Sequence, residues 1–156
     1  MTWPKEVKPR EGESPGTRFE EFEVGAALPE LRFTLTPEVC RAYAGAVCAE
    51  ASGYQVGGRT VAVPSTLAVY LMAVLYRRYP PAQGGIMAGN SFRFHAPLPM
   101  DEDVEISATG RIEETFVKRG RNYVRYSARF TVGGELVAEA ENLSTFSSAN
   151  SSEEPS

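Results

Sequence analysis

Apolar and polar residues alternate in five stretches of the chain, and a period of two is typical of strands that bury one face. The first stretch is 30–35, where Leu31, Phe33 and Leu35 alternate with polar neighbours. The others lie in the second half of the chain, over 91–95, 104–113, 123–132 and 136–146. The pattern therefore predicts one early strand and a later run of four antiparallel strands.

Two helices are predicted between these stretches. Thr36, Pro37 and Glu38 favour a helix start, because threonine can cap, proline suits the first turn and a carboxylate stabilises the positive N-terminus. This helix is expected to end near Ala49. A second helix is expected over about 64–78, and its apolar side chains leave almost no polar face, which predicts that it is buried: Leu67, Val69, Leu71, Met72, Val74 and Leu75.

One buried helix beside an antiparallel run of strands predicts an α+β fold, in which a curved antiparallel sheet wraps around one long apolar helix. This arrangement is called the hotdog fold. Such a sheet leaves its edge strands unpaired, so we expect a dimer.

The register of the last hairpin can be argued from its side chains. A two-residue Gly133-Gly134 loop in a regular ladder places Arg129 opposite Ala138. A three-residue loop that includes Glu135 instead pairs Val132 with Leu136, Phe130 with Ala138, Ala128 with Ala140 and Arg129 with Glu139. The second register joins apolar to apolar and cation to anion, so it is the predicted one.

Composition limits the domain organisation and the function classes. The 156 residues suggest a single domain over 18–147, with a disordered arm at 1–17 and a disordered tail at 148–156, where charge, Pro, Gly and Ser dominate. Within 26–147 there are 12 basic and 12 acidic residues, which does not indicate a nucleic-acid binder. No apolar run reaches the roughly 18 residues of a membrane span, and the start lacks a secretory pattern, so a cytoplasmic protein is expected.

The two cysteines, Cys40 and Cys48, are eight residues apart on the predicted first helix. That spacing corresponds to about 12 Å along a helix, which is too far for a disulfide. We expect both to be reduced thiols in or near the core.

Several motifs occur in a familiar order. Residues 19–25 read Phe-Glu-Glu-Phe-Glu-Val-Gly, 35–38 read Leu-Thr-Pro-Glu, 92–99 read Phe-Arg-Phe-His-Ala-Pro-Leu-Pro, and 118–121 and 133–138 lie in the closing strands. Together they resemble the MaoC-like hotdog family over about 19–146. The resemblance implies reversible hydration of an enoyl thioester, usually on coenzyme A, which is then part of the substrate; no separate cofactor is expected.

The same resemblance implies an Asp and, five residues later, a His in the loop after the first helix. This chain has neither in that loop, which reads Glu-Ala-Ser-Gly-Tyr-Gln-Val-Gly-Gly-Arg over 50–59. The candidates there are Glu50 and Tyr54, because a desolvated carboxylate can act as a base. His95 lies in a different predicted strand, beside Arg93 and away from Phe92 and Phe94, and is expected to be structural.

Two further groups could bind substrate. Ser65 and Thr66 open the apolar helix, where free N–H groups could hold a thioester carbonyl oxygen, although they could also simply cap it. Lys118, Arg119 and Arg121 could hold the phosphates of coenzyme A, although they could also be a solvated turn. Residues 101–103, Asp-Glu-Asp, are expected to be a solvated turn, and no metal site is expected.

The sequence therefore predicts a protein that acts on or binds acyl-CoA thioesters, of the hydratase or dehydratase type, as a homodimer or as a heterodimer with another hotdog subunit. In the heterodimer the partner would supply the missing Asp and His. The alternatives are a non-catalytic thioester-binding partner and a thioesterase that uses Glu50 to activate water.

Overall fold

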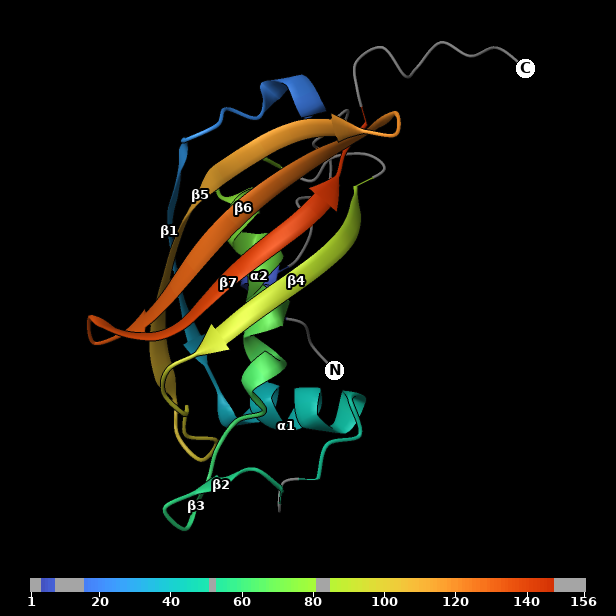
Figure 1. Cartoon of the computed structure of the whole chain (residues 1–156). Helices are drawn as coiled ribbons and strands as arrows, with labels where there is room; N and C mark the ends of the chain where they lie inside the picture. Colours follow the sequence, from blue (N-terminus) through green and yellow to red (C-terminus); the bar gives the residue numbers. More distant parts are fainter. Residues whose placement is uncertain (1–3, 8–15, 51–52, 81–84, 148–156) are drawn as a thin grey trace.

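A computed structural model describes residues 4–7, 16–50, 53–80 and 85–147. Five antiparallel strands form one sheet in the order β1-β5-β6-β7-β4 (Figure 1). Their bounds are Ala27–Leu35 (β1), Ile86–Phe94 (β4), Val104–Lys118 (β5), Arg121–Val132 (β6) and Glu135–Thr145 (β7). All five predicted strands are present, most of them longer than their alternating cores.

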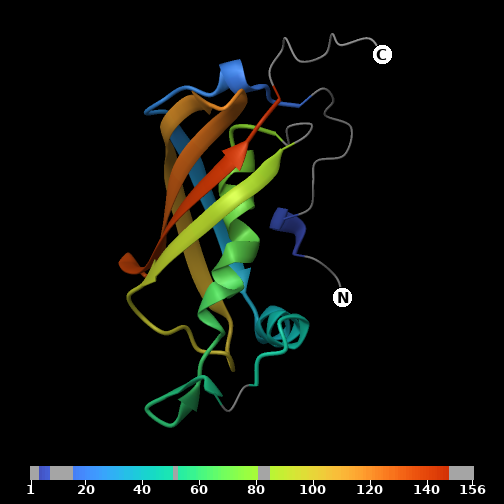
Figure 2. The ribbon, with the colours of Figure 1, turned by 45° about the vertical axis from the view of Figure 1, so that its right-hand side comes forward.

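The sheet curves around a helix that fills its concave face (Figure 2). A 3-10 turn, η4 (Pro64–Leu67), leads directly into the helix α2 (Ala68–Tyr76). Leu71, Val74 and Leu75 are completely buried, and the Tyr126 hydroxyl on β6 donates to the Leu71 carbonyl at 3.2 Å. The predicted arrangement, a sheet wrapped around one apolar helix, is therefore confirmed.

The first helix, α1 (Pro37–Ala46), starts as predicted. The Thr36 hydroxyl accepts a hydrogen bond from the Val39 N–H at 3.3 Å and caps the helix. The helix is shorter than predicted, and Cys48 lies beyond it with a positive φ of 54°. Cys40 is buried, as expected, and burial raises the pKa of its thiol, whereas Cys48 is exposed and not a core residue.

The β6–β7 hairpin combines the two registers that the sequence allows. The loop is the two-residue one, with Gly133 and Gly134 both at positive φ, and Val132 pairs with Glu135. A β-bulge follows, and beyond it Arg129 lies opposite Glu139 as predicted, with their side chains in an ion pair at 3.2 Å. The predicted three-residue loop is wrong because the bulge supplies the extra residue.

The segment expected to be a loop after α1 contains a small hairpin. Strands β2 (Gln55–Val56) and β3 (Arg59–Thr60) are joined by two glycines at positive φ. The Arg59 guanidinium forms ion pairs with Asp101 at 2.8 Å and Glu102 at 3.2 Å. These contacts hold the hairpin against the loop before β5, which gives the Asp-Glu-Asp run a structural partner. No cluster of three metal-ligating residues occurs within the described ranges.

Strand β4 is an edge of the sheet and is exposed over most of its length. Ile86 is 63% exposed, Met87 58% and Phe94 41%, although Phe92 packs against the core. The expected unpaired edge is present at this strand, and the structure adds that this edge carries exposed apolar side chains.

Of the arm predicted to be disordered at 1–17, the structure describes residues 4–7 and 16–17. The 3-10 turn η1 (Lys5–Val7) lies against α2, with Val7 packed on the core, while 1–3 and 8–15 lie outside the described residues, as does the predicted tail 148–156. A second 3-10 turn, η2 (Phe19–Glu21), precedes Phe22, whose ring packs on Tyr79 and Phe146.

Candidate functional site

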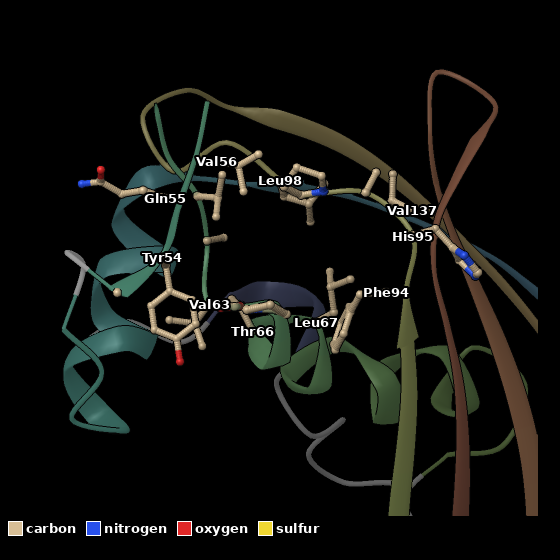
Figure 3. Close-up of a pocket in the computed structure, with 16 residues that line it drawn as sticks. Tyr54, Gln55, Val56, Val63, Thr66, Leu67, Phe94, His95, Leu98 and Val137 are labelled. Atoms are coloured by element: carbon tan, nitrogen blue, oxygen red, sulfur yellow. The ribbon is translucent and has the colours of Figure 1, made fainter. Parts of the chain in front are cut away.

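A cavity of about 360 Å³ opens at the end of the sheet where α1, the β2–β3 hairpin and the start of η4 meet (Figure 3). Its walls come from the segments 53–56, 61–67 and 94–98 and from Val137. The Ala62 N–H donates to the Leu98 carbonyl at 2.8 Å and links two of these segments. Its lining is Gly53, Tyr54, Gln55, Val56, Val61, Ala62, Val63, Pro64, Thr66, Leu67, Phe94, His95, Ala96, Pro97, Leu98 and Val137.

The bulge in β7 shapes one side of this cavity. Val137 has no partner on β6, and its carbonyl accepts from the His95 N–H at 2.9 Å and from the Ala96 N–H at 3.4 Å. The chain that leaves β4 is thereby held against β7, and the Val137 side chain lines the cavity. Sequence reasoning missed this wall, although the two adjacent glycines and the competing registers of the hairpin were its signal.

The lining is mostly apolar and offers little acid or base. None of the described lining residues is Asp or Glu. Tyr54 lines the cavity as expected, but its hydroxyl points away from the centre of the cavity, as does the Gln55 amide (Figure 3). Glu50, the other candidate, is exposed and does not border the cavity. The structure therefore does not bring Glu50 and Tyr54 together as an acid/base pair over this cavity.

His95 borders the cavity through its backbone while its ring turns outward (Figure 3). The ring Nε2 lies 2.9 Å from the Glu139 carboxylate on the outer face of the sheet. That hydrogen bond, with the nearby Arg129, holds the pKa of the Glu139 carboxyl below its usual range. The geometry agrees with the structural role expected for His95.

The start of η4 contributes Pro64 and Thr66 to the cavity wall, whereas Ser65 between them is not one of the lining residues. Thr66 uses its own polar groups internally, because both its N–H and its hydroxyl donate to the Val63 carbonyl, at 2.9 and 2.6 Å. The Ser65 hydroxyl accepts from the Tyr43 hydroxyl on α1 at 3.0 Å. The Ser65 backbone N–H has no acceptor within the described part of the chain, and it follows a proline that has no N–H to offer.

The predicted phosphate-binding cations lie elsewhere. Lys118, Arg119 and Arg121 form the turn between β5 and β6, at the end of the sheet opposite the cavity (Figure 1). All three are exposed. Within one chain the structure therefore does not bring them to the candidate site.

Comparisons with known proteins find similar structures but no similar sequence family. No protein-family model matches the chain, and no curated protein matches it in sequence. The R-hydratase PhaJ1 from Pseudomonas aeruginosa has a similar structure at 18% identity and a TM-score of 0.64, covering 90% of this chain and 95% of its own. A MaoC-like dehydratase from Rhodospirillum rubrum is similar at 19% identity and 0.63, covering 85% and 98%.

A third similar structure is a two-subunit complex. The HadBC (3R-hydroxyacyl-ACP dehydratase) complex from Mycobacterium tuberculosis matches at 21% identity and a TM-score of 0.59, over 78% of this chain and 96% of its own.

No helix in the described ranges is long and apolar enough to cross a membrane. The chain thus has the hotdog fold, as predicted, and its structural neighbours are MaoC-like dehydratases and R-hydratases.

Proposed function

We propose that this chain binds an acyl-CoA thioester in the cavity at the start of η4, as a hotdog protein of the hydratase or dehydratase type that lacks its own acid/base pair. In the active enzyme a second hotdog subunit supplies the missing Asp and His. The observation that supports this is an apolar cavity with no carboxylate in its described lining, in a fold whose structural neighbours are hydratases and dehydratases. We expect the protein in the cytoplasm.

The acyl chain is the part of the ligand that suits the cavity walls. Val56, Val63, Leu67, Leu98 and Val137 present hydrocarbon to the space. Burial of apolar surface contributes roughly 25 cal/mol per Å², so a hydrocarbon chain gains from this lining where a polar ligand does not.

The proposed donor to the thioester carbonyl is the Ser65 N–H, which lies between the lining residues Pro64 and Thr66. A backbone N–H at the start of a helical segment carries a partial positive charge and can polarise a carbonyl oxygen. The Tyr43–Ser65 hydrogen bond fixes this turn relative to α1. In this proposal the Ser65 N–H positions the thioester carbonyl, while the Ser65 hydroxyl accepts from Tyr43.

Hydration also needs a base that activates water and an acid that protonates the α-carbon of the enoyl group. The described cavity residues provide neither in a suitable position, because Glu50 is not among them, the Tyr54 hydroxyl points away from the cavity and the His95 ring is turned outward. This arrangement favours a binding role that a partner completes. It gives no support to the thioesterase alternative, which depends on Glu50.

The exposed edge of β4 is the surface through which we expect pairing. An edge strand with open backbone groups and apolar side chains at Ile86, Met87 and Phe94 is costly to leave in water. In the isolated protein a second copy adds its β4 antiparallel to this edge; in the active enzyme the catalytic hotdog subunit takes that place.

The test measures binding by titration with a saturated thioester, and turnover separately with the unsaturated crotonyl-CoA. Isothermal titration with butyryl-CoA is expected to show binding, and Ala96→Trp at the exposed rim of the cavity is expected to abolish it. Ala46→Trp at the exposed end of α1 is the matched control and is expected to bind normally. Absence of binding by the folded, unmodified chain would contradict the proposal, and binding without turnover under every pairing would favour a non-catalytic thioester-binding protein.

A further inference from the structure

The turn between β5 and β6 carries three cations that the fold does not neutralise. Among the described residues, no carboxylate forms an ion pair with Lys118, Arg119 or Arg121. The arginines further along the same strands are all paired: Arg111 with Glu113, Arg125 with Glu114 and Glu141, and Arg129 with Glu139. Along β5 and β6, the cations without a carboxylate partner among the described residues are therefore those of the turn.

The local geometry of the turn is unfavourable for these residue types. Lys118 lies directly opposite Arg121 in the ladder, and like charges in that position repel. Arg119 has a φ of 51°, in the left-handed region that glycine or asparagine would occupy at lower cost. An anion that binds all three side chains would offset the repulsion between their charges.

The turn cannot serve the cavity of its own chain. Phe94 at the cavity lies in one row of the sheet with Ala138, Phe130 and Ala108. From Ala108 to Lys118 the strand advances ten residues, roughly 33 Å at about 3.3 Å per residue. This span exceeds the reach of a pantetheine arm from a thioester to its phosphates.

A second copy paired at β4 removes this mismatch. Antiparallel pairing along the strand places the Phe94 end of one copy beside the Ile86 end of the other, and Figure 1 shows the β5–β6 turn at that same end of the sheet. Ile86 shares a row with Thr145, Tyr123 and Phe116. From the partner's strand to Tyr123 there are three strand spacings, roughly 14 Å at about 4.8 Å each, and Arg121 of the turn lies two residues before Tyr123.

We propose that Lys118, Arg119 and Arg121 of one copy bind the phosphates of the coenzyme A thioester held in the cavity of the second copy. This inference rests on the proposed function and adds a trans-acting site to it. The ligand chemistry is a nucleoside phosphate on a pantetheine arm, recognised through its charge by cations of the neighbouring chain.

The first experiment removes the charges and compares two ligands by isothermal titration. The variant Lys118→Gln, Arg119→Gly, Arg121→Gln is expected to weaken butyryl-CoA about tenfold, since each exposed ion pair contributes a few-fold. It is expected to leave butyryl-pantetheine, which lacks the phosphates, unchanged. The control Lys5→Gln, Arg41→Gln, Arg77→Gln removes the same charge from exposed positions off the sheet and is expected to bind both ligands normally.

The second experiment tests whether the turn contacts the ligand in the cavity of its own chain or of the neighbouring chain. The turn variant and Ala96→Trp are co-expressed with different tags, and the mixed dimer is purified. In the mixed dimer the open cavity belongs to the turn variant, and it faces the intact turn of the Ala96→Trp copy. We therefore expect wild-type affinity for butyryl-CoA at half the stoichiometry. Weak binding in the mixed dimer, or recovery of monomers only, overturns the trans arrangement.

The outcomes separate this inference from the proposed function. If the unmodified chain binds both thioesters equally, the phosphate site is refuted and the cavity proposal stands. If it binds neither, the proposed function itself fails. Tighter binding of a butyryl group on an acidic carrier protein than on coenzyme A, lost in the turn variant, would assign the turn to that protein and overturn the nucleotide site.

Discussion

Gly110, in the middle of β5, permits the close approach of two strands to each other and to α2. It pairs with Ala128 on one side and Leu28 on the other. A Cβ at this position would lie 2.3 Å from the backbone oxygen of Ser127, and 3.2 and 3.3 Å from side-chain atoms of Leu28 and Val74. The nearest atom is backbone, so it cannot move aside alone.

The cost of Gly110→Ala follows from this geometry. An ordinary C···O contact is about 3.3 Å or more, so β5 and β6 must separate locally by about 1 Å. Overpacking of a core costs about 1–3 kcal/mol, and a weakened ladder hydrogen bond about 1 kcal/mol. We expect a loss of roughly 3 kcal/mol in the free energy of unfolding, which corresponds to a fall in Tm of about 6–12 °C for a chain of this size.

Urea unfolding followed by circular dichroism measures this loss, and Gly45→Ala is the control. Gly45 lies in α1, away from the β4 edge, has no positive φ, and has nothing within 4 Å of its added Cβ. It is expected to raise stability rather than to lower it, because alanine favours a helix over glycine. A Gly110→Ala protein within 0.5 kcal/mol of wild type, a margin that is roughly the error of such comparisons, would refute the packing argument.

Further changes have smaller expected effects. Gly45→Ala in α1 should stabilise by about 1 kcal/mol, since nothing lies near the added Cβ; a loss in urea unfolding would contradict this. Thr36→Ala should destabilise by about 1 kcal/mol through loss of the cap, while Thr36→Ser should not; equal losses would exclude a capping role. Tyr126→Phe should cost about 1 kcal/mol, because its buried hydroxyl donates to a backbone carbonyl, and an unchanged midpoint would argue against that bond. The Arg111 hydrogen bond lowers the pKa of Glu113, so this pair stabilises the fold above the ordinary carboxyl pKa of 4.5 and the contribution is lost as pH falls through the lowered value; Glu113→Gln should reduce the pH dependence of the urea midpoint in that acid range, and an identical pH profile would contradict it.

The sequence predicts the fold well where one force dominates. The residues of α2 are apolar on nearly every side, so burial is the only stable outcome for them. The capping threonine and the alternation of the later strands are equally direct. Arg129 and Glu139 meet because the apolar pairs on the opposite face of the same hairpin require that register.

The sequence predicts the site less well, because its walls come from separate segments. The bulge at Val137 conserves the favourable pairs while the loop keeps two residues, and alternation alone does not distinguish this from a three-residue loop. The distance of the basic turn from the cavity depends on the length of β5 and β6, which the turn joins. Lys118 is far from Tyr54 and Ser65 along the chain, and this separation does not tell how far apart they are in the fold. Only the arrangement of the strands shows that the basic turn and the cavity lie at opposite ends of the sheet.

The central claim is that this chain binds a CoA thioester but does not hydrate it alone. The most direct measurement adds crotonyl-CoA to the purified, folded chain, and follows binding by titration and hydration by loss of the conjugated thioester absorbance. We predict binding that Ala96→Trp abolishes, and no hydration above the rate in buffer without protein. Hydration by the chain alone, abolished by Ala96→Trp, would contradict the account and show that an acid and a base act at this cavity.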